Sequence, residues 1–320
     1  MEITFDNVFC GYKAGAAVLR GVSLHLSGPG LVCIIGPNGV GKSTLIRCMN
    51  GLLKPSSGSV AVNGKDIGEY SANGLSEFIG YVPVTSQDCF SMPVFDTVLM
   101  GRYRRNKWRT GPEDIDATER TLKLLGLSDL AMHGFNELSA GQHQKVALAR
   151  GLVREPEMLI LDEPTSNLDV RHQVYVTELL HEIAVQCGMM VVMISHDLNI
   201  SARYADKIIV MDRPGTIKAI GDANDVITEE MIAEVYGVDC EIIRRKGRPH
   251  VILGSAIGGC ANPRSVRPRQ PRRTGVIFLA PERCSQTACL RRFVVSGFLV
   301  NTYKTIGSRC RMRLRQRTLR

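Results

Sequence analysis

The chain has 320 residues, a length that allows a core of about 200 residues or more together with an appendage. Its 44% hydrophobic and 22% charged residues are typical of a globular protein, which excludes a fibrous or wholly disordered chain. The net charge of +9 comes from one end: residues 256–320 hold 14 Arg, one Lys and one acid, whereas residues 1–255 hold 25 basic and 30 acidic residues. The body is therefore mildly acidic, and we expect no nucleic acid as its partner.

The N-terminal segment MEITFDNVFCGY alternates apolar and polar residues, as an edge strand does. It has neither the basic nor the apolar part of a secretory signal, and no apolar run approaches the roughly 18 residues of a membrane helix. The ten cysteines include no Cys-x-x-Cys pair, so we expect reduced thiols in the cytosol. Any membrane association would come through a partner.

After the N-terminal segment, strand patterns alternate with helical ones, which predicts an α/β fold with a mostly parallel sheet covered on both faces. The predicted core strands are LVCII (31–35), MLILD (158–162) and MMVVMIS (189–195). KSTLIRCMNGLL (42–53) is a predicted helix. Residues 93–155, approximately, show helical spacing without strand patterns and are predicted to form a helical insertion.

Residues 256–320 are predicted to be a basic, disordered extension of a body that spans residues 1–255. The stretch ANPRSVRPRQPRRTG is rich in Pro and Arg and has no apolar period. A shifted reading frame through GC-rich DNA can yield such a bias. The alternative is a basic tail that contacts anionic lipid or nucleic acid.

The stretch GPNGVGKST follows the first core strand and precedes a helix, the context that the phosphate-loop pattern G-x-x-x-x-G-K-[ST] requires. Its glycines let backbone N–H groups converge on phosphate oxygens, Lys42 neutralises phosphate charge, and Ser43 is a ligand for Mg²⁺. The predicted nucleotide site therefore consists of Gly36, Pro37, Asn38, Gly39, Val40, Gly41, Lys42, Ser43 and Thr44.

Polar side chains at two further strand ends extend this site. Asp162 is predicted to hold the magnesium shell, and Glu163 to be the general base that polarises the attacking water. A lone His is usually structural, but three strand ends with polar groups favour a role for His196 at the γ-phosphate or the water. Tyr12 could stack on adenine, with a core tyrosine as the alternative.

A second anion-binding design, LSAGQHQKVALAR (138–150), places a Ser-Ala-Gly turn at the start of a predicted helix. Taken alone, it could be a helix capped by Ser139. The order of Tyr12, GPNGVGKST, LSAGQ, LILDEP, SNLD (166–169) and His196 resembles the ATP-binding subunits of ABC transporters. The resemblance covers about residues 1–250.

The resemblance implies a P-loop ATPase fold with a mixed sheet, an N-terminal antiparallel β portion and a helical insertion. It also implies a homodimer of head-to-tail subunits that bind ATP and Mg²⁺ and drive an integral-membrane permease dimer from the cytoplasmic face of the membrane. The residues of one subunit that would close over ATP on the partner's phosphate loop are Ser139, Ala140, Gly141 and Gln142. Asn167 and Asp169 would line the seam between the subunits.

The sequence departs from the family pattern at Val84, where the family has a Gln that links the magnesium site to the permease. Gln87 could substitute as a metal ligand, or coupling could be weakened. Ala140 in place of Gly and Lys145 in place of Arg are milder changes.

The stretches VFDTVLMGR and DVITEEMIAEVYGVDCEI (225–242) resemble the importers of iron(III) chelates, haem and cobalamin, which use an extracellular substrate-binding protein. Two alternatives belong to other classes. A soluble ATPase of the same fold could act on nucleic acid or a protein assembly, although the coiled-coil insertion and second nucleotide domain of such relatives are lacking. A non-hydrolysing regulatory module fits Val84 but not Glu163 and His196.

Overall fold

The computed structural model describes residues 1–12, 16–83, 92–103, 110–166 and 168–254, together with the backbone of residues 289–295 and 298–304. The chain divides into two compact units, Met1–Ala261 and Asn262–Arg320. In the second unit, β13 (Cys289–Val295) pairs antiparallel with β14 (Phe298–Lys304). The rest of that unit lies outside the described residues, so its predicted disorder stays a prediction. All predicted site residues belong to the first unit.

A six-stranded sheet in the order β10-β9-β3-β8-β7-β6 forms the centre of the first unit. β10 (Thr216–Gly221) is antiparallel to its neighbour, so the sheet is mixed, as the resemblance implied. The all-apolar sequences of the central strands suit a sheet that is buried on both faces. The parallel strands are β3 (Gly30–Ile35), β6 (Ile79–Val82), β7 (Met158–Leu161), β8 (Met190–Ile194) and β9 (Lys207–Asp212).

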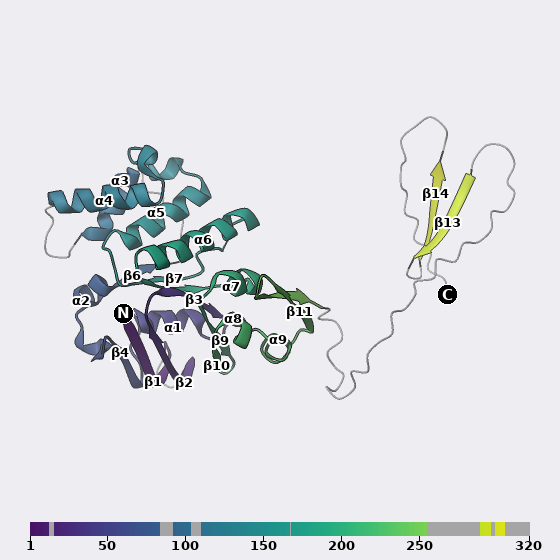
Figure 1. The fold of residues 1–320 in the computed structure, drawn as a ribbon, viewed down its shortest axis with the longest axis horizontal. Coiled ribbons are helices and arrows are strands. Elements are labelled where there is room, and N and C mark those ends of the chain that lie inside the picture. The colour runs from purple at the N-terminus through teal and green to yellow at the C-terminus, as the bar shows by residue number, and fades with distance from the viewer. Residues whose placement is uncertain are drawn as a thin grey trace. The chain divides into compact units, whose positions relative to one another are not determined.

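A second sheet is antiparallel and has the order β2-β1-β4-β5. Its strands are β1 (Glu2–Cys10), β2 (Leu19–Ser27), β4 (Ser57–Val62) and β5 (Lys65–Asp66). The helix α1 (Lys42–Met49) packs between the two sheets (Figure 1). It ends before the predicted residue 53, because Gly51 takes a left-handed conformation with φ 70° just after the helix.

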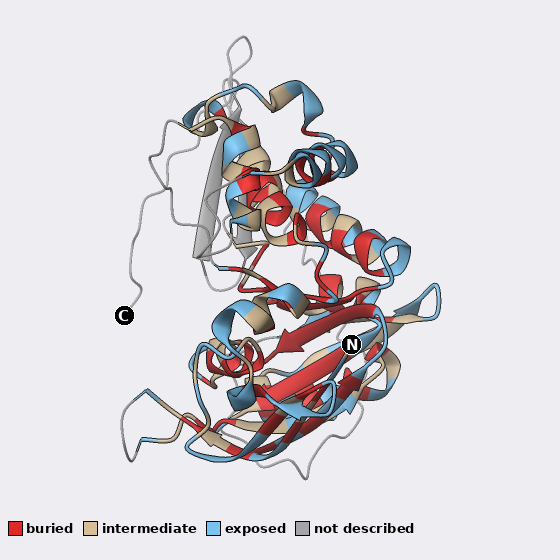
Figure 2. Cartoon of the chain, turned by 90° about the vertical axis from the view of Figure 1, so that its left-hand side faces the viewer, coloured by how far each residue is buried: buried red, intermediate tan, exposed pale blue. Residues whose placement is uncertain are grey.

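Successive side chains of β3 enter two different cores, as the two-residue period of a strand requires. Leu31 and Cys33 pack with the helices on one face of the central sheet. Val32 and Ile34 pack with α1 and the antiparallel sheet on the other face. Figure 2 shows the strands of the first unit largely in the colour of buried residues. Because both faces are covered, polar groups can collect only at the strand ends.

The segment between β6 and β7 is helical in its described parts, and its helices lie on the same side of the central sheet as α6 (Val170–Gln186) (Figure 1). VFDTVLMGRYRR is an α-helix only as far as Leu99 and continues as a 3-10 turn over Met100–Arg102. The helices are α3 (Val94–Leu99), α4 (Pro112–Leu124) and α5 (Ala140–Leu152).

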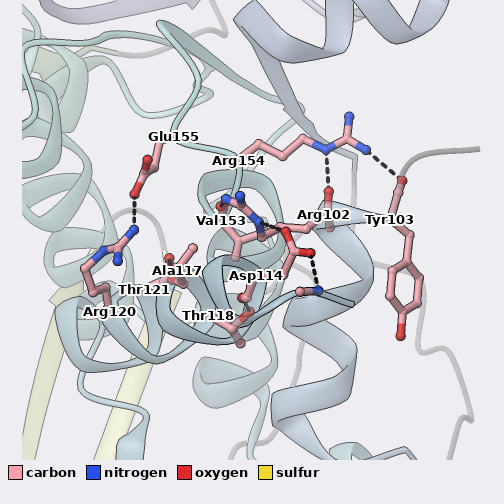
Figure 3. Close-up of polar contacts among 12 residues, drawn as sticks. Arg102, Tyr103, Asp114, Ala117, Thr118, Arg120, Thr121, Val153, Arg154 and Glu155 are labelled. Carbon is pink, nitrogen blue, oxygen red and sulfur yellow. Dashed lines mark hydrogen bonds and ion pairs between the residues drawn. The ribbon is translucent and has the colours of Figure 1, made fainter. Parts of the chain in front are cut away.

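Two arginine side chains, Arg102 and Arg154, connect parts of this helical segment to one another (Figure 3). Arg154 also connects the segment to α2 (Ala72–Phe78). Arg154 donates to the carbonyl oxygens of Gly101 and Tyr103 and, over 2.6 Å, to Oγ of Ser76 in α2. Arg102 pairs with Asp114 over 2.6 Å and donates to the carbonyl of Val153 over 2.9 Å. These contacts join segments that are distant in sequence.

The end of the first unit packs against the sheet edge through α7 (Leu198–Tyr204), α8 (Ala223–Val226) and α9 (Glu229–Tyr236). A hairpin of β11 (Cys240–Arg245) and β12 (Arg248–Leu253) follows. Its backbone is tied to α7, because the side-chain amide of Asn199 exchanges two hydrogen bonds with Val251. Among the described residues, no helix has both the length and the apolar sequence needed to cross a membrane.

Candidate functional site

The phosphate loop lies between β3 and α1, and its glycines adopt backbone conformations that other residues avoid. Gly36 has φ 148° and Gly41 has φ 102°. A Cβ atom at Gly36 would lie 2.4 Å from the carbonyl oxygen of Met211, so the loop leaves no space for a side chain there. Gly39, with φ 80°, has no neighbour within 4 Å of such an atom. The loop is therefore packed tightly at its start and open at its tip.

Lys42 is the buried cation of this loop. It is only 6% exposed, and its Nζ donates to the carbonyl oxygens of Gly36 over 2.8 Å and Pro37 over 2.9 Å. Burial lowers the pKa of Lys42, and the negative charges of Glu163 and Asp162 act against that shift. A buried ammonium group gains from an anionic partner, and phosphate oxygens can supply one.

Ser43 and Asp162 meet beside the loop, with Ser43 Oγ donating to Asp162 Oδ1 over 3.2 Å. Asp162 is 5% exposed, and burial raises its pKa while the bond from Ser43 acts against the shift. A buried carboxylate and a hydroxyl are the hard oxygen donors that Mg²⁺ prefers. The two residues therefore fit a magnesium site. The backbone N–H of Asp162 also donates to the carbonyl of Val82 over 3.0 Å, which fixes the end of β7 to β6.

Glu163 and His196 follow the ends of β7 and β8, and their side chains meet. Nε2 of His196 donates to Oε1 of Glu163 over 2.8 Å, and the side chains are 45% and 31% exposed, respectively. Glu163 has a left-handed backbone with φ 50°, which is unusual for a residue other than glycine. The pair thus presents an oriented carboxylate to solvent, as a general base for water requires.

Tyr12 is 55% exposed, which excludes the alternative of a core tyrosine. Its hydroxyl accepts hydrogen bonds from Arg47 Nη1 over 3.1 Å and from Thr44 Oγ1 over 3.4 Å. The guanidinium carbon of Arg47 lies 5.7 Å from the ring centroid. The ring is therefore held over α1 with a large part of its surface free for stacking.

The LSAGQ segment lies at the start of α5 and forms a separate cluster. Ser139 is the N-cap: its Oγ accepts from Gln142 N over 3.4 Å, and Gln142 Oε1 accepts from Ser139 N over 2.8 Å. Asp169 caps α6 in the same way, through His172 N. Within the described residues, no hydrogen bond or ion pair of Ser139, Gly141 or Gln142 reaches the phosphate loop.

The structure thus brings Tyr12, the phosphate loop, Asp162, Glu163 and His196 together, and leaves Ser139–Gln142 and Asp169 elsewhere. Val84, Gln87 and Asn167 lie outside the described residues, so their predicted roles stay predictions. The part of the chain that the structure describes holds no group of three or more His, Cys, Asp or Glu side chains suited to a metal ion. The fit to Mg²⁺ therefore rests on Asp162 and the Ser43 hydroxyl.

Two contacts at this site have no sequence motif that predicts them. Arg47 supports Tyr12, and its only signal is a basic residue one helical turn after Ser43. Tyr236, at the end of α9, accepts a hydrogen bond from the backbone of Gly36, while burial raises the pKa of Tyr236 to about 12. The Tyr-Gly turn was recognised only as a family likeness, because nothing local in the sequence indicates that long-range contact.

Comparison with known proteins assigns the chain to a family. The family model described as ABC transporter matches residues 19–166. An uncharacterized ABC transporter ATP-binding protein of Methanocaldococcus jannaschii is 40% identical over 79% of this chain and 98% of its own length. The hemin import ATP-binding protein HmuV of Escherichia coli O157:H7 is 36% identical over 72% of this chain and 90% of its own. The phosphonates import ATP-binding protein PhnC of Nitratidesulfovibrio vulgaris is 34% identical over 71% and 88%, respectively.

Solved structures agree. One described as an inward-facing "metal-chelate type ABC transporter" has a TM-score of 0.68 at 27% identity and covers 79% of this chain and 97% of that one. A dimeric ATP-binding cassette in a post-hydrolysis state, bound to ADP and Pi, has a TM-score of 0.57 at 29% identity and covers 69% and 98%. The chain therefore belongs to the ABC transporter family, as an ATP-binding subunit that hydrolyses ATP with Mg²⁺.

Proposed function

We propose that the chain powers an importer as a homodimer of head-to-tail subunits, bound to a permease dimer at the cytoplasmic face of the membrane. One observation carries this proposal. The phosphate loop, Asp162 and Glu163 are assembled in one cluster, whereas Ser139 and Gly141 lie in another that, among the described residues, makes no bond to the first. A site that uses both clusters requires two chains.

In this proposal the residues of the first cluster divide the work of hydrolysis. Backbone N–H groups of the phosphate loop and Lys42 bind phosphate oxygens, and Tyr12 stacks on adenine. Ser43 and Asp162 would hold Mg²⁺, which when bound offsets the charge that develops on the phosphate oxygens. Glu163 accepts a proton from the attacking water, and the bond from His196 keeps its carboxylate oriented.

The second cluster would act on the nucleotide of the partner subunit. The N-terminus of α5, with the free N–H groups and the positive end of the helix dipole, is suited to an anion. Ser139 and Gln142 form reciprocal hydrogen bonds in the isolated chain, so both side chains are already fixed at that helix end. Asn167 and Asp169 would lie along the seam.

Mixed subunits test action across the seam. A heterodimer of one Lys42→Ala subunit and one Ser139→Arg subunit contains one site with both changes and one unchanged site. We expect each variant alone to be inactive and the mixture to recover part of the ATPase activity. Absence of any recovery, with heterodimers verified by differential tagging, would show that Ser139 does not serve the partner's site.

For the cargo we propose an iron(III) chelate, haem or cobalamin, received from an extracellular substrate-binding protein. The hemin relative and the metal-chelate structure support this choice, as do VFDTVLMGR and the turn after Tyr236. The phosphonate relative is almost as similar, so identity alone does not select a cargo.

Uptake of labelled ferric siderophore, haem, cobalamin and phosphonate should be compared in cells with and without the gene. We expect loss of uptake for one of the first three and normal phosphonate uptake. Normal uptake of all three, with loss of phosphonate or another solute, would overturn the assignment.

A further inference from the structure

His172, in the first turn of α6, makes a contact that helix capping does not need. Its backbone N–H already donates to Asp169 Oδ1 over 2.9 Å, which completes the cap. In addition, Nδ1 of its ring lies 2.9 Å from both carboxylate oxygens of Asp169 and donates to them. The imidazole is therefore fixed in one orientation by the aspartate.

The other edge of the same ring lies against the LSAGQ turn. A Cβ atom built at Gly141 would lie 3.2 Å from Cδ2 and 3.5 Å from Nε2 of His172. A side chain at this position would crowd the ring, so the backbone of Gly141 lies close to the imidazole. One ring contacts two segments that are distant in sequence, the turn at the start of α5 and the residue that caps α6.

The arrangement also keeps the aspartate ionised. Hydrogen bonds from the backbone and the ring of His172 lower the pKa of Asp169. The side chains of Asp169 and His172 are 66% and 51% exposed, so both lie at the surface of the isolated chain. Both side chains are therefore accessible to a second molecule in an already ordered arrangement.

We propose that His172 is a positioning residue that holds Asp169 and the LSAGQ turn at a fixed spacing, so that both meet the partner subunit and its nucleotide as one surface. The inference rests on the proposed head-to-tail dimer. Without the ring, the two segments would have to be ordered at the moment of association, which weakens association without changing nucleotide binding to one chain.

The test uses the Glu163→Gln protein, in which ATP should persist and hold the dimer. The ATP concentration for half-maximal dimerisation is measured by light scattering after size exclusion, with His172→Ala or His172→Asn added. We expect an increase of about fivefold or more for alanine. Asparagine, whose amide can still donate to Asp169, should restore the value to within about twofold. Affinity for fluorescent ADP, which does not drive dimerisation, should stay unchanged.

His181→Ala is the matched control, because His181 lies in the same helix and also faces an aspartate, Asp206, over 3.7 Å. It should leave dimerisation unchanged. The inference is wrong if His172→Ala dimerises at the same ATP concentration as its parent, if it behaves as His181→Ala does, or if asparagine is as defective as alanine. Failure of Glu163→Gln itself to dimerise would instead overturn the proposed function, and this inference with it.

Discussion

Nε2 of His196 lies 2.8 Å from Oε1 of Glu163, although the two residues follow different strands of the central sheet. The bond joins the proposed general base to an imidazole donor that follows the adjacent strand. Any change that separates β7 from β8 at this end would therefore misorient the carboxylate. The relationship makes the pair the first target for substitution.

Glu163→Gln should lower kcat about 100-fold or more, because an amide cannot accept the proton of the attacking water. The amide keeps the size of the side chain and can still accept the bond from His196. ATP binding should therefore remain, which equilibrium binding of labelled ATP would reveal. Turnover close to that of the unchanged protein would remove Glu163 from the role of base.

Asp162→Asn should stabilise the nucleotide-free protein while abolishing Mg²⁺-dependent hydrolysis. Burial raises the pKa of Asp162, so the folded chain binds this proton more tightly than the unfolded chain does. The charged form therefore costs stability above the folded-state pKa, and the cost disappears below the unfolded value of about 4. In EDTA at pH 7.5, Tm should rise by roughly 2–4 °C for each kcal/mol recovered.

The same comparison at lower pH tests whether the charge of Asp162 causes the difference in Tm. The difference in Tm should shrink as the pH falls toward 4, since the unchanged protein then carries a neutral side chain at this position as well. A lower Tm for the variant at pH 7.5 would show that the carboxylate stabilises the empty site.

Arg154→Ala should lower the free energy of unfolding by about 2 kcal/mol, because it removes the donors that serve Gly101, Tyr103 and Ser76. Arg120→Ala is the control. Arg120 pairs with Glu155 over 2.9 Å, but the side chains are 63% and 65% exposed, so its loss should cost no more than about 0.5 kcal/mol. Equal effects in urea unfolding would contradict the structural role of Arg154.

Removal of all residues after 254 should leave ATPase activity and Tm unchanged. The last described residue of the body is still bonded to it, since Gly254 N donates to the carbonyl of Asp239 over 2.7 Å. Differential scanning calorimetry and an ATPase assay of the shortened and full chains check this. A large loss of either property would show that the basic tail packs on the body.

The central strands could be predicted because each is an apolar run that leads directly into a motif. β3, β7 and β8 lie within one or two residues of their predicted ranges. The hairpin of β11 and β12 was not predicted, because CEIIRR and RPHVIL mix charged and apolar residues without a clear period. It is stabilised instead by Asn199, more than 40 residues earlier in the chain.

The site shows the same division between local and long-range information. The phosphate loop and the Asp162–Glu163 pair are local motifs, and the pairing of Glu163 with His196 follows from adjacent parallel strands. The ring of His172 against Gly141 and the bond from Gly36 to Tyr236 depend on packing between helices. No local pattern in a single sequence indicates which residues of different helices will meet.

Glu163 combines a strained, left-handed backbone with the side chain proposed for hydrolysis, so at this residue thermal stability and turnover favour different amino acids. A residue with a side chain costs about 1–2 kcal/mol of stability in this conformation, and glycine would remove most of that cost. Part of the gain would be offset, because glycine loses more conformational entropy on folding. Glycine at this position would thus give a more stable protein without ATPase activity. A laboratory screen that ranks variants by thermal survival would select against the carboxylate, whereas a screen for ATP hydrolysis would keep it.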